Sequence, residues 1–196
     1  MTSIFTKSIL LMSMLMHISS FANLNPKSII KKGTKIIYDV SYNGMQYSLD
    51  ITIQEVENKF SFEWNTSKPL NKNGIINIQK NATQNASTLF NFFTEDKAEL
   101  VDQTSILISN KMFQNWQKNS SMEIYLDNEK NKKSIFGNGY DHTQNFQYKN
   151  DNSNEFNCRT VSDIDGYSIT YLNDAEFPII VEMHLDWSIK LRRIIN

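Results

Sequence analysis

The chain has 196 residues, of which 40% are hydrophobic and 21% charged, and its formal net charge at pH 7 is −1. This length suits a single globular domain and is enough to bury a substantial core. Because acidic and basic residues nearly balance and are interspersed, the composition argues against a nucleic-acid-binding protein and against adsorption to an anionic membrane surface.

The first 22 residues have the pattern of a secretory signal peptide. Lys7 supplies a positive charge, an apolar run covers residues 9–18, and Ser20-Phe21-Ala22 has the small residues of a cleavage site. The alternative, a retained membrane anchor, is weaker because spanning a bilayer takes roughly twenty apolar residues. We therefore expect an exported protein, periplasmic or extracellular, with one β-rich domain over residues 23–196 and no membrane span after cleavage.

A β-hairpin is predicted near the start of the mature chain. Apolar residues alternate with polar ones over residues 36–42 and again over residues 47–53, and Asn43-Gly44 between them is the preferred pair for a type I′ turn. After a reversal at Glu57-Asn58, residues 60–64 continue the same two-residue period. The pattern predicts an antiparallel meander with one apolar and one polar face.

The period changes in the middle of the chain. Asn73-Gly74 is expected to form a turn into a short strand that ends near Ile78. Apolar residues between 82 and 93 recur at the spacing of one helix face, so a helix is predicted over residues 82–93. Residues 100–108 could then pair as a strand.

A second helix is predicted after Ser109, which is a plausible N-cap. Met112, Phe113 and Trp116 would form its buried side. Strand patterns return over residues 122–126, 146–148 and 167–171, and the longest alternation of all runs from Phe177 to Leu191. Either one long strand or a hairpin near Asp186 would keep all the apolar residues on one face of the sheet.

No motif of an enzyme or a metal centre is found in the sequence. There is no G-x-S-x-G nucleophile motif and no H-x-x-x-H or C-x-x-C pair, and only His142 and His184 remain after cleavage. We expect no enzyme activity, no metal and no cofactor, with a hydrolase as a distant alternative that would need an acid–base pair formed only by the fold.

Three further short patterns have ordinary structural interpretations. Cys158 is the only cysteine, so no intramolecular disulfide can form, and we expect it to be a small buried hydrophobe. Asp163-Ile164-Asp165-Gly166 is interpreted as a turn, since the remaining ligands of a calcium loop are missing. Gly137-Asn138-Gly139 is interpreted as a mobile hairpin tip.

The remaining candidate site is the aromatic-rich apolar face of the predicted sheet. Its proposed ligand-binding members are Phe60, Phe62, Trp64, Met183 and Trp187. A closed core formed by the sheet and the two helices is one interpretation. A concave hydrophobic pocket is the other, if the helices cover the face only in part.

The chain resembles a broad group of exported bacterial proteins built as an antiparallel half-barrel with helices in its mouth, which includes lipoprotein carriers and uncharacterised relatives. The resemblance rests on the hairpin Tyr38 to Gly44, the central helical interruption, and the segment Phe177 to Met183 before a final strand. It implies a non-enzymatic binding or carrier role in which the concave sheet holds an acyl chain or a protein partner.

We therefore predict a β-rich α+β fold, an antiparallel meander or half-barrel with about two helices packed on one face. The leading functional hypothesis is an exported carrier whose apolar concavity accepts a lipid-like ligand or a hydrophobic segment of a partner. The alternative is a structural or protein-interaction component of a cell-envelope assembly that binds no small molecule.

Overall fold

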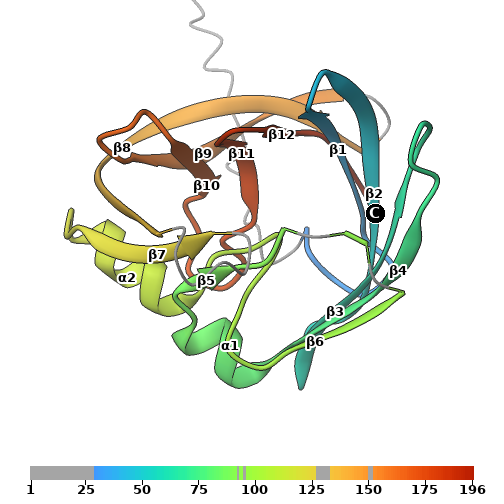
Figure 1. The fold of residues 1–196 in the computed structure, drawn as a ribbon, viewed down its shortest axis with the longest axis horizontal. Coiled ribbons are helices and arrows are strands. Elements are labelled where there is room, and N and C mark those ends of the chain that lie inside the picture. Colours follow the sequence, from blue (N-terminus) through green and yellow to red (C-terminus); the bar gives the residue numbers. More distant parts are fainter. Residues whose placement is uncertain (1–28, 92, 95, 127–132, 150–151) are drawn as a thin grey trace, which may run out of the picture.

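The computed structural model describes residues 29–91, 93–94, 96–126, 133–149 and 152–196, and the expected signal peptide lies outside these ranges. The described residues form a curved sheet of 12 strands, mostly antiparallel, accompanied by two helices (Figure 1). The β-rich α+β class predicted from the sequence is confirmed.

In chain order the elements are β1 (Lys35–Tyr42), β2 (Met45–Glu55), β3 (Lys59–Thr66), β4 (Asn73–Gln79), α1 (Lys80–Asn85), β5 (Thr88–Leu89), β6 (Lys97–Leu100), α2 (Asn110–Gln117), β7 (Met122–Leu126), β8 (Lys133–Tyr148), β9 (Asn152–Ser162), β10 (Ser168–Leu172), β11 (Ile180–His184) and β12 (Ser188–Ile195). Their order across the sheet is β5-β7-β8-β9-β10-β11-β12-β1-β2-β3-β4-β6. Strands adjacent in sequence therefore pair through most of the sheet. The parallel pairs are β4–β6, β5–β7 and β8–β12.

The predicted hairpins at both ends of the chain are present. β1 and β2 pair in unbroken register around Asn43 and Gly44, whose φ angles of 49° and 75° are those of a type I′ turn. At the C-terminus the long alternation divides into β11 and β12, so the hairpin near Asp186 is the correct alternative. β12 then pairs with β1, which joins the two ends of the described chain at the centre of the sheet.

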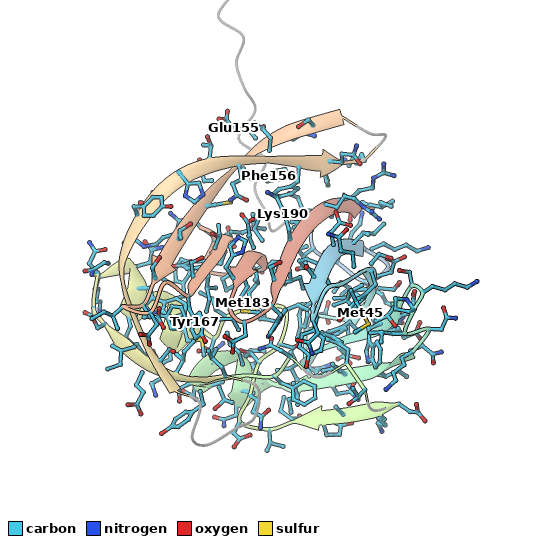
Figure 2. All side chains as sticks on the ribbon, turned by 45° about the horizontal axis from the view of Figure 1, so that its top comes forward. Met45, Glu155, Phe156, Tyr167, Met183 and Lys190 are labelled. Carbon is cyan, nitrogen blue, oxygen red and sulfur yellow. The ribbon has the colours of Figure 1, made fainter. Side chains whose placement is uncertain are left out.

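Strands β8 to β12 close into a ring. They pair consecutively in antiparallel fashion, and β8 also pairs with β12 through Gln147–Arg193 and Tyr148–Ile194. Figure 1 shows β8 and β9 as a long arch beside β11 and β12. Within the ring the Phe146 and Phe156 rings stack with their centroids 4.0 Å apart. Figure 2 shows Phe156 on the arch and Lys190 on the strand beneath it.

The main core lies on the other face of these strands and continues over β1 to β4. Paired residues of an antiparallel ladder share a face, so Tyr38, Leu49 and Leu191 point to one side of the sheet, and all three are buried. Helix α2 packs on this side, where the Trp116 ring lies 5.8 Å from that of Tyr171. The apolar face predicted from the alternation is thus covered over most of its area.

The second predicted helix is confirmed in position and orientation. The Ser109 hydroxyl accepts a hydrogen bond from the Met112 backbone N–H at 3.1 Å, as an N-cap should. Met112, Phe113 and Trp116 are its buried residues. None of the helices in the described ranges has both the length and the apolar character needed to cross a bilayer.

The first predicted helix is too long. Helix α1 ends at Asn85, and Ala86 already has an extended backbone with ψ of 146°. The chain instead forms backbone hydrogen bonds from Phe90 N–H to Thr104 O at 2.7 Å and from Thr104 N–H to Thr88 O at 3.0 Å. The apolar spacing of residues 82–93 is compatible with either arrangement, and the long-range pairing overrides it.

The strand suggested for residues 100–108 is also wrong in extent. β6 ends at Leu100, and the later residues form only isolated bridges, Leu89 with Thr104 and Leu107 with Ile179. The Ile180 backbone N–H donates to Ile106 O at 2.9 Å. Residues 104–108 are therefore held against the start of β11 and contribute buried side chains to the core.

Two segments predicted as turns lie within strands instead. Asn73-Gly74 is the first part of β4, paired with Asn65 and Trp64, because the chain has already reversed over residues 67–71. Gly137-Asn138-Gly139 is not a hairpin tip, since it lies inside β8, where the pairing with β9 is irregular. A Cβ added at Gly139 would lie 2.7 Å from Arg159 Nε, so this position needs glycine for a close approach.

Candidate binding cavity

A cavity of about 510 Å³ opens at the end of the apolar face where the β1–β2 and β11–β12 turns lie side by side. Buried aliphatic side chains of Val40, Leu49 and Ile189 form its floor. Half-buried aromatic side chains of Tyr47 and Trp187 stand beside them. The cavity is therefore lined most deeply by purely apolar groups.

The aromatic wall is held by contacts with the core and with its own members. The Phe93 ring packs edge-on against the buried Trp64 ring, with centroids 5.4 Å apart. Burial, with a smaller contribution from neighbouring Tyr42, raises the pKa of the Tyr47 phenol above its ordinary value. The wall is therefore a neutral surface at physiological pH.

The rim of the cavity is polar and exposed. Asn43, Lys72, Thr94 and Asp186 are its exposed polar members, with one cation and one carboxylate among them. The Tyr167 hydroxyl donates to Asp186 Oδ1 at 2.7 Å, which positions this carboxylate beside the β11–β12 turn. From mouth to floor, the lining changes from charged and polar groups through aromatic side chains, with the half-buried Asn91 among them, to aliphatic ones.

A small void of about 10 Å³ lies at the inner end of the cavity. The two share Asn91, Phe93, Trp187 and Ile189 in their linings, and the void reaches inward to Tyr38 and Ser105. The Tyr38 hydroxyl donates to Ile180 O at 2.8 Å, and its burial raises the pKa of the phenol far above the usual range.

The five residues predicted for the apolar face have different locations. Trp187 lines the cavity and Met183 lines the inner void. Trp64 supports the wall from behind through Phe93, and Phe62 is completely buried in the core. Phe60 borders a different pocket of about 160 Å³ beside the β2–β3 turn. The apolar face is thus mostly core, with an opening at one end.

The sequence-based prediction of the site omitted several lining residues. Tyr47 belongs to the alternation that predicted the first hairpin, and Met45 lies two residues before it. The side of the sheet on which both side chains lie could therefore have been inferred from that pattern. Lys72 and Asp186 have no comparable signal, because they come together with the hairpin only through the curvature of the sheet. Phe93 was assigned to the predicted helix and lies instead in the cavity wall.

The two histidines lie on different strands of the ring, His142 on β8 and His184 on β11. His184 is exposed at the end of β11, with Nε2 3.1 Å from Glu182 Oε1. His142 lies in β8 opposite Cys158, which is fully buried. Burial raises the pKa of the Cys158 thiol to about 12, so the reactive thiolate is suppressed.

The remaining polar motifs are structural. Asp163 Oδ1 accepts hydrogen bonds from the backbone N–H groups of Asp165 and Tyr167, which closes the turn predicted there. No group of three or more His, Cys, Asp or Glu side chains placed to hold a metal ion is found in the described part of the chain.

Arg159 is buried, and its guanidinium is hydrogen-bonded to oxygen atoms of the protein. Its guanidinium donates to Asp141 Oδ1 at 2.7 Å, to Trp116 O at 3.1 Å and to Gly139 O at 3.2 Å. It also donates to Asn119 Oδ1. The side chain therefore ties the C-terminal end of α2 to β8, and Arg159 is not among the residues that line the cavity.

Comparison with known proteins finds no protein-family model, no curated protein and no solved structure that matches this chain.

Proposed function

We propose that this protein is an exported, non-enzymatic binding or carrier protein that holds a lipid-like amphiphile in the cavity between the β1–β2 and β11–β12 turns. The observation that supports the proposal most directly is the order of the lining, from a polar rim through aromatic walls to an aliphatic floor. A volume of about 510 Å³ is in the range of small-molecule sites. Such a gradient complements a ligand with a polar head and an apolar chain.

The energetics favour such a ligand over a small polar one. Each methylene group moved from water into the cavity contributes about 0.8 kcal/mol. The rim supplies one lysine for an acidic head, while the floor supplies no charge to compensate a buried ion. The apolar chain should therefore lie inside with the head at the mouth.

Export is the second part of the proposal. The signal-peptide pattern of residues 1–22 and the resemblance to exported half-barrel carriers support it. Native mass spectrometry of the protein purified from its own host should show a chain beginning at Asn23 with a retained lipid-sized ligand. A chain retaining residues 1–22 would contradict signal-peptide cleavage, and a stoichiometric protein partner without lipid would favour an envelope-assembly role.

A cavity-filling variant tests the binding site directly. Met45 lines the cavity at the start of β2 and is only half-buried, so Met45→Trp should fill the entrance without disturbing the core. We expect at least a tenfold loss of affinity for a fluorescent fatty acid, measured by titration.

The matched control is Ile135→Trp, because Ile135 is 61% exposed on β8 and does not line the cavity. Both variants add a comparable aromatic volume to a strand. Equal binding by Met45→Trp, Ile135→Trp and the unaltered protein would refute the proposed site.

A further inference from the structure

One residue that lines the inner void has a hydroxyl group that the fold leaves unpaired. Ser105 is 2% exposed, and its Oγ has no hydrogen-bond partner among the described residues. Ser105 also lines the void at the inner end of the cavity. Because buried polar groups are nearly always hydrogen-bonded, an unpaired one beside an empty space calls for a partner in that space.

The surroundings restrict the chemistry of this partner. Ile106, Ile180 and Met183 supply apolar surface. Asn91 adds an uncharged amide, and none of the residues that line the void is charged. A buried carboxylate or ammonium group would have no counter-ion there, so its desolvation would be uncompensated. An uncharged oxygen fits, since Ser105 can donate to it and Tyr38, whose own proton is used by Ile180 O, can accept from a hydroxyl.

The size of the void also fits a single uncharged oxygen atom. About 10 Å³ is close to the least space that holds one water-sized oxygen. A ligand that follows the cavity inward past Trp187 and Ile189 would place its last atom at this point. A chain ending in a methyl group would leave the serine hydroxyl unpaired, which costs affinity relative to a chain ending in a hydroxyl.

We propose that Ser105 is a specificity-determining residue, and that the cavity selects amphiphiles whose buried end carries an uncharged oxygen, such as an ω-hydroxyl group. This inference rests on the proposed lipid-binding function and specifies the ligand class for the same cavity. The polar head remains at the mouth near Lys72, and the terminal oxygen hydrogen-bonds to Ser105.

The test compares decanoic, dodecanoic and tetradecanoic acids with their ω-hydroxy counterparts by displacement of a fluorescent fatty acid. Each pair shares its head group and differs only at the buried end. At the chain length that reaches the void, the unaltered protein should bind the hydroxylated acid three- to tenfold tighter, roughly the effect of one neutral hydrogen bond. The dicarboxylic acid of that length should bind more weakly than either.

Ser105→Ala should abolish or reverse this preference while binding the unhydroxylated acids at least as well. Thr104→Val is the matched control, because Thr104 is equally buried, its hydroxyl is likewise unpaired among the described residues, and it is not among the residues lining the cavity or the void. This control should keep the preference of the unaltered protein.

The outcomes separate the two proposals. If the unhydroxylated acids bind but ω-hydroxylation gives no advantage at any length, or if Ser105→Ala retains the advantage, the role of Ser105 is refuted and the lipid cavity stands. If no fatty acid of either series binds, both proposals are overturned.

Discussion

Individual buried polar side chains differ in whether they have hydrogen-bond partners in the protein. Arg159 is only 5% exposed, and each of its three guanidinium nitrogen atoms donates to an oxygen atom of the protein. The Thr160 and Thr170 hydroxyls bond to each other at 2.7 Å. Ser105, beside the inner void, has no such partner among the described residues. Other buried polar atoms, such as Thr104 Oγ1 and Trp116 Nε1, also lack a partner among the described residues, but Ser105 is the one of these three that lines the void.

Cys158 gives a prediction at the same scale. Its pKa in the folded protein is about 12, raised by burial, whereas in the unfolded chain the thiol ionises near pH 9. Because the pKa of the thiol is higher in the folded protein, burial of the protonated thiol contributes its full stability below the pKa of the unfolded chain. This contribution is lost as the pH rises through the pKa of the folded protein. The free energy of unfolding should therefore decline for this reason between about pH 9 and pH 12.

Comparison with Cys158→Ala isolates this effect from other titrations. The stability advantage of the unaltered protein over the variant, measured by denaturant unfolding, should shrink across that pH range. The native thiol should also resist alkylation at neutral pH and react once the protein is unfolded. A pH-independent difference between the two proteins would contradict this account.

At the scale of elements, the sequence predicts a helix end best where a side chain forms a hydrogen bond with the backbone of that end. Ser109 is the example, because its hydroxyl accepts from Met112 N–H and also donates to Ala86 O at 2.6 Å. The same hydroxyl therefore caps α2 and fixes the end of the segment that follows α1.

Substitution of Ser109 can separate these two roles. Ser109→Ala removes both hydrogen bonds and should lower the free energy of unfolding by about 2 kcal/mol, measured with chemical denaturant. Ser109→Asp retains an acceptor for the helix N-terminus but cannot donate to Ala86 O when ionised. An aspartate variant as stable as the unaltered protein would show that the bond to Ala86 contributes little.

At the scale of the whole molecule, closure links the two halves of the sheet. β12 pairs with β11, with β1 and with the end of β8, so this one strand joins the meander to the ring. The buried apolar residues form one continuous cluster that extends across both parts. The described chain therefore has one core and no internal boundary at which unfolding could stop.

We accordingly expect one cooperative unfolding transition. Tryptophan fluorescence reports on Trp64 in β3, Trp116 in α2 and Trp187 at the cavity, while far-UV circular dichroism reports on the whole sheet. Denaturation curves from the two signals should coincide. Separate midpoints would show that the meander and the ring unfold independently.

The sequence by itself determined the features that depend on neighbouring residues. The Asn43-Gly44 turn, the cap at Ser109 and the parity of the strands follow from local dihedral preferences and local hydrogen bonds. The sequence also placed Trp187 and Met183 on the apolar face, although it could not distinguish them from core residues such as Phe62.

Only the tertiary structure decided where that face stays open. Residues 82–93 have helical spacing, yet hydrogen bonds between residues 88–90 and Thr104 end the helix early and place Phe93 in the cavity wall. The mouth exists because β12 pairs with β1 and brings Trp187 beside Tyr42 and Tyr47 from the other end of the chain. Such contacts depend on the competition among long-range pairings across the whole sheet, which local preference does not determine.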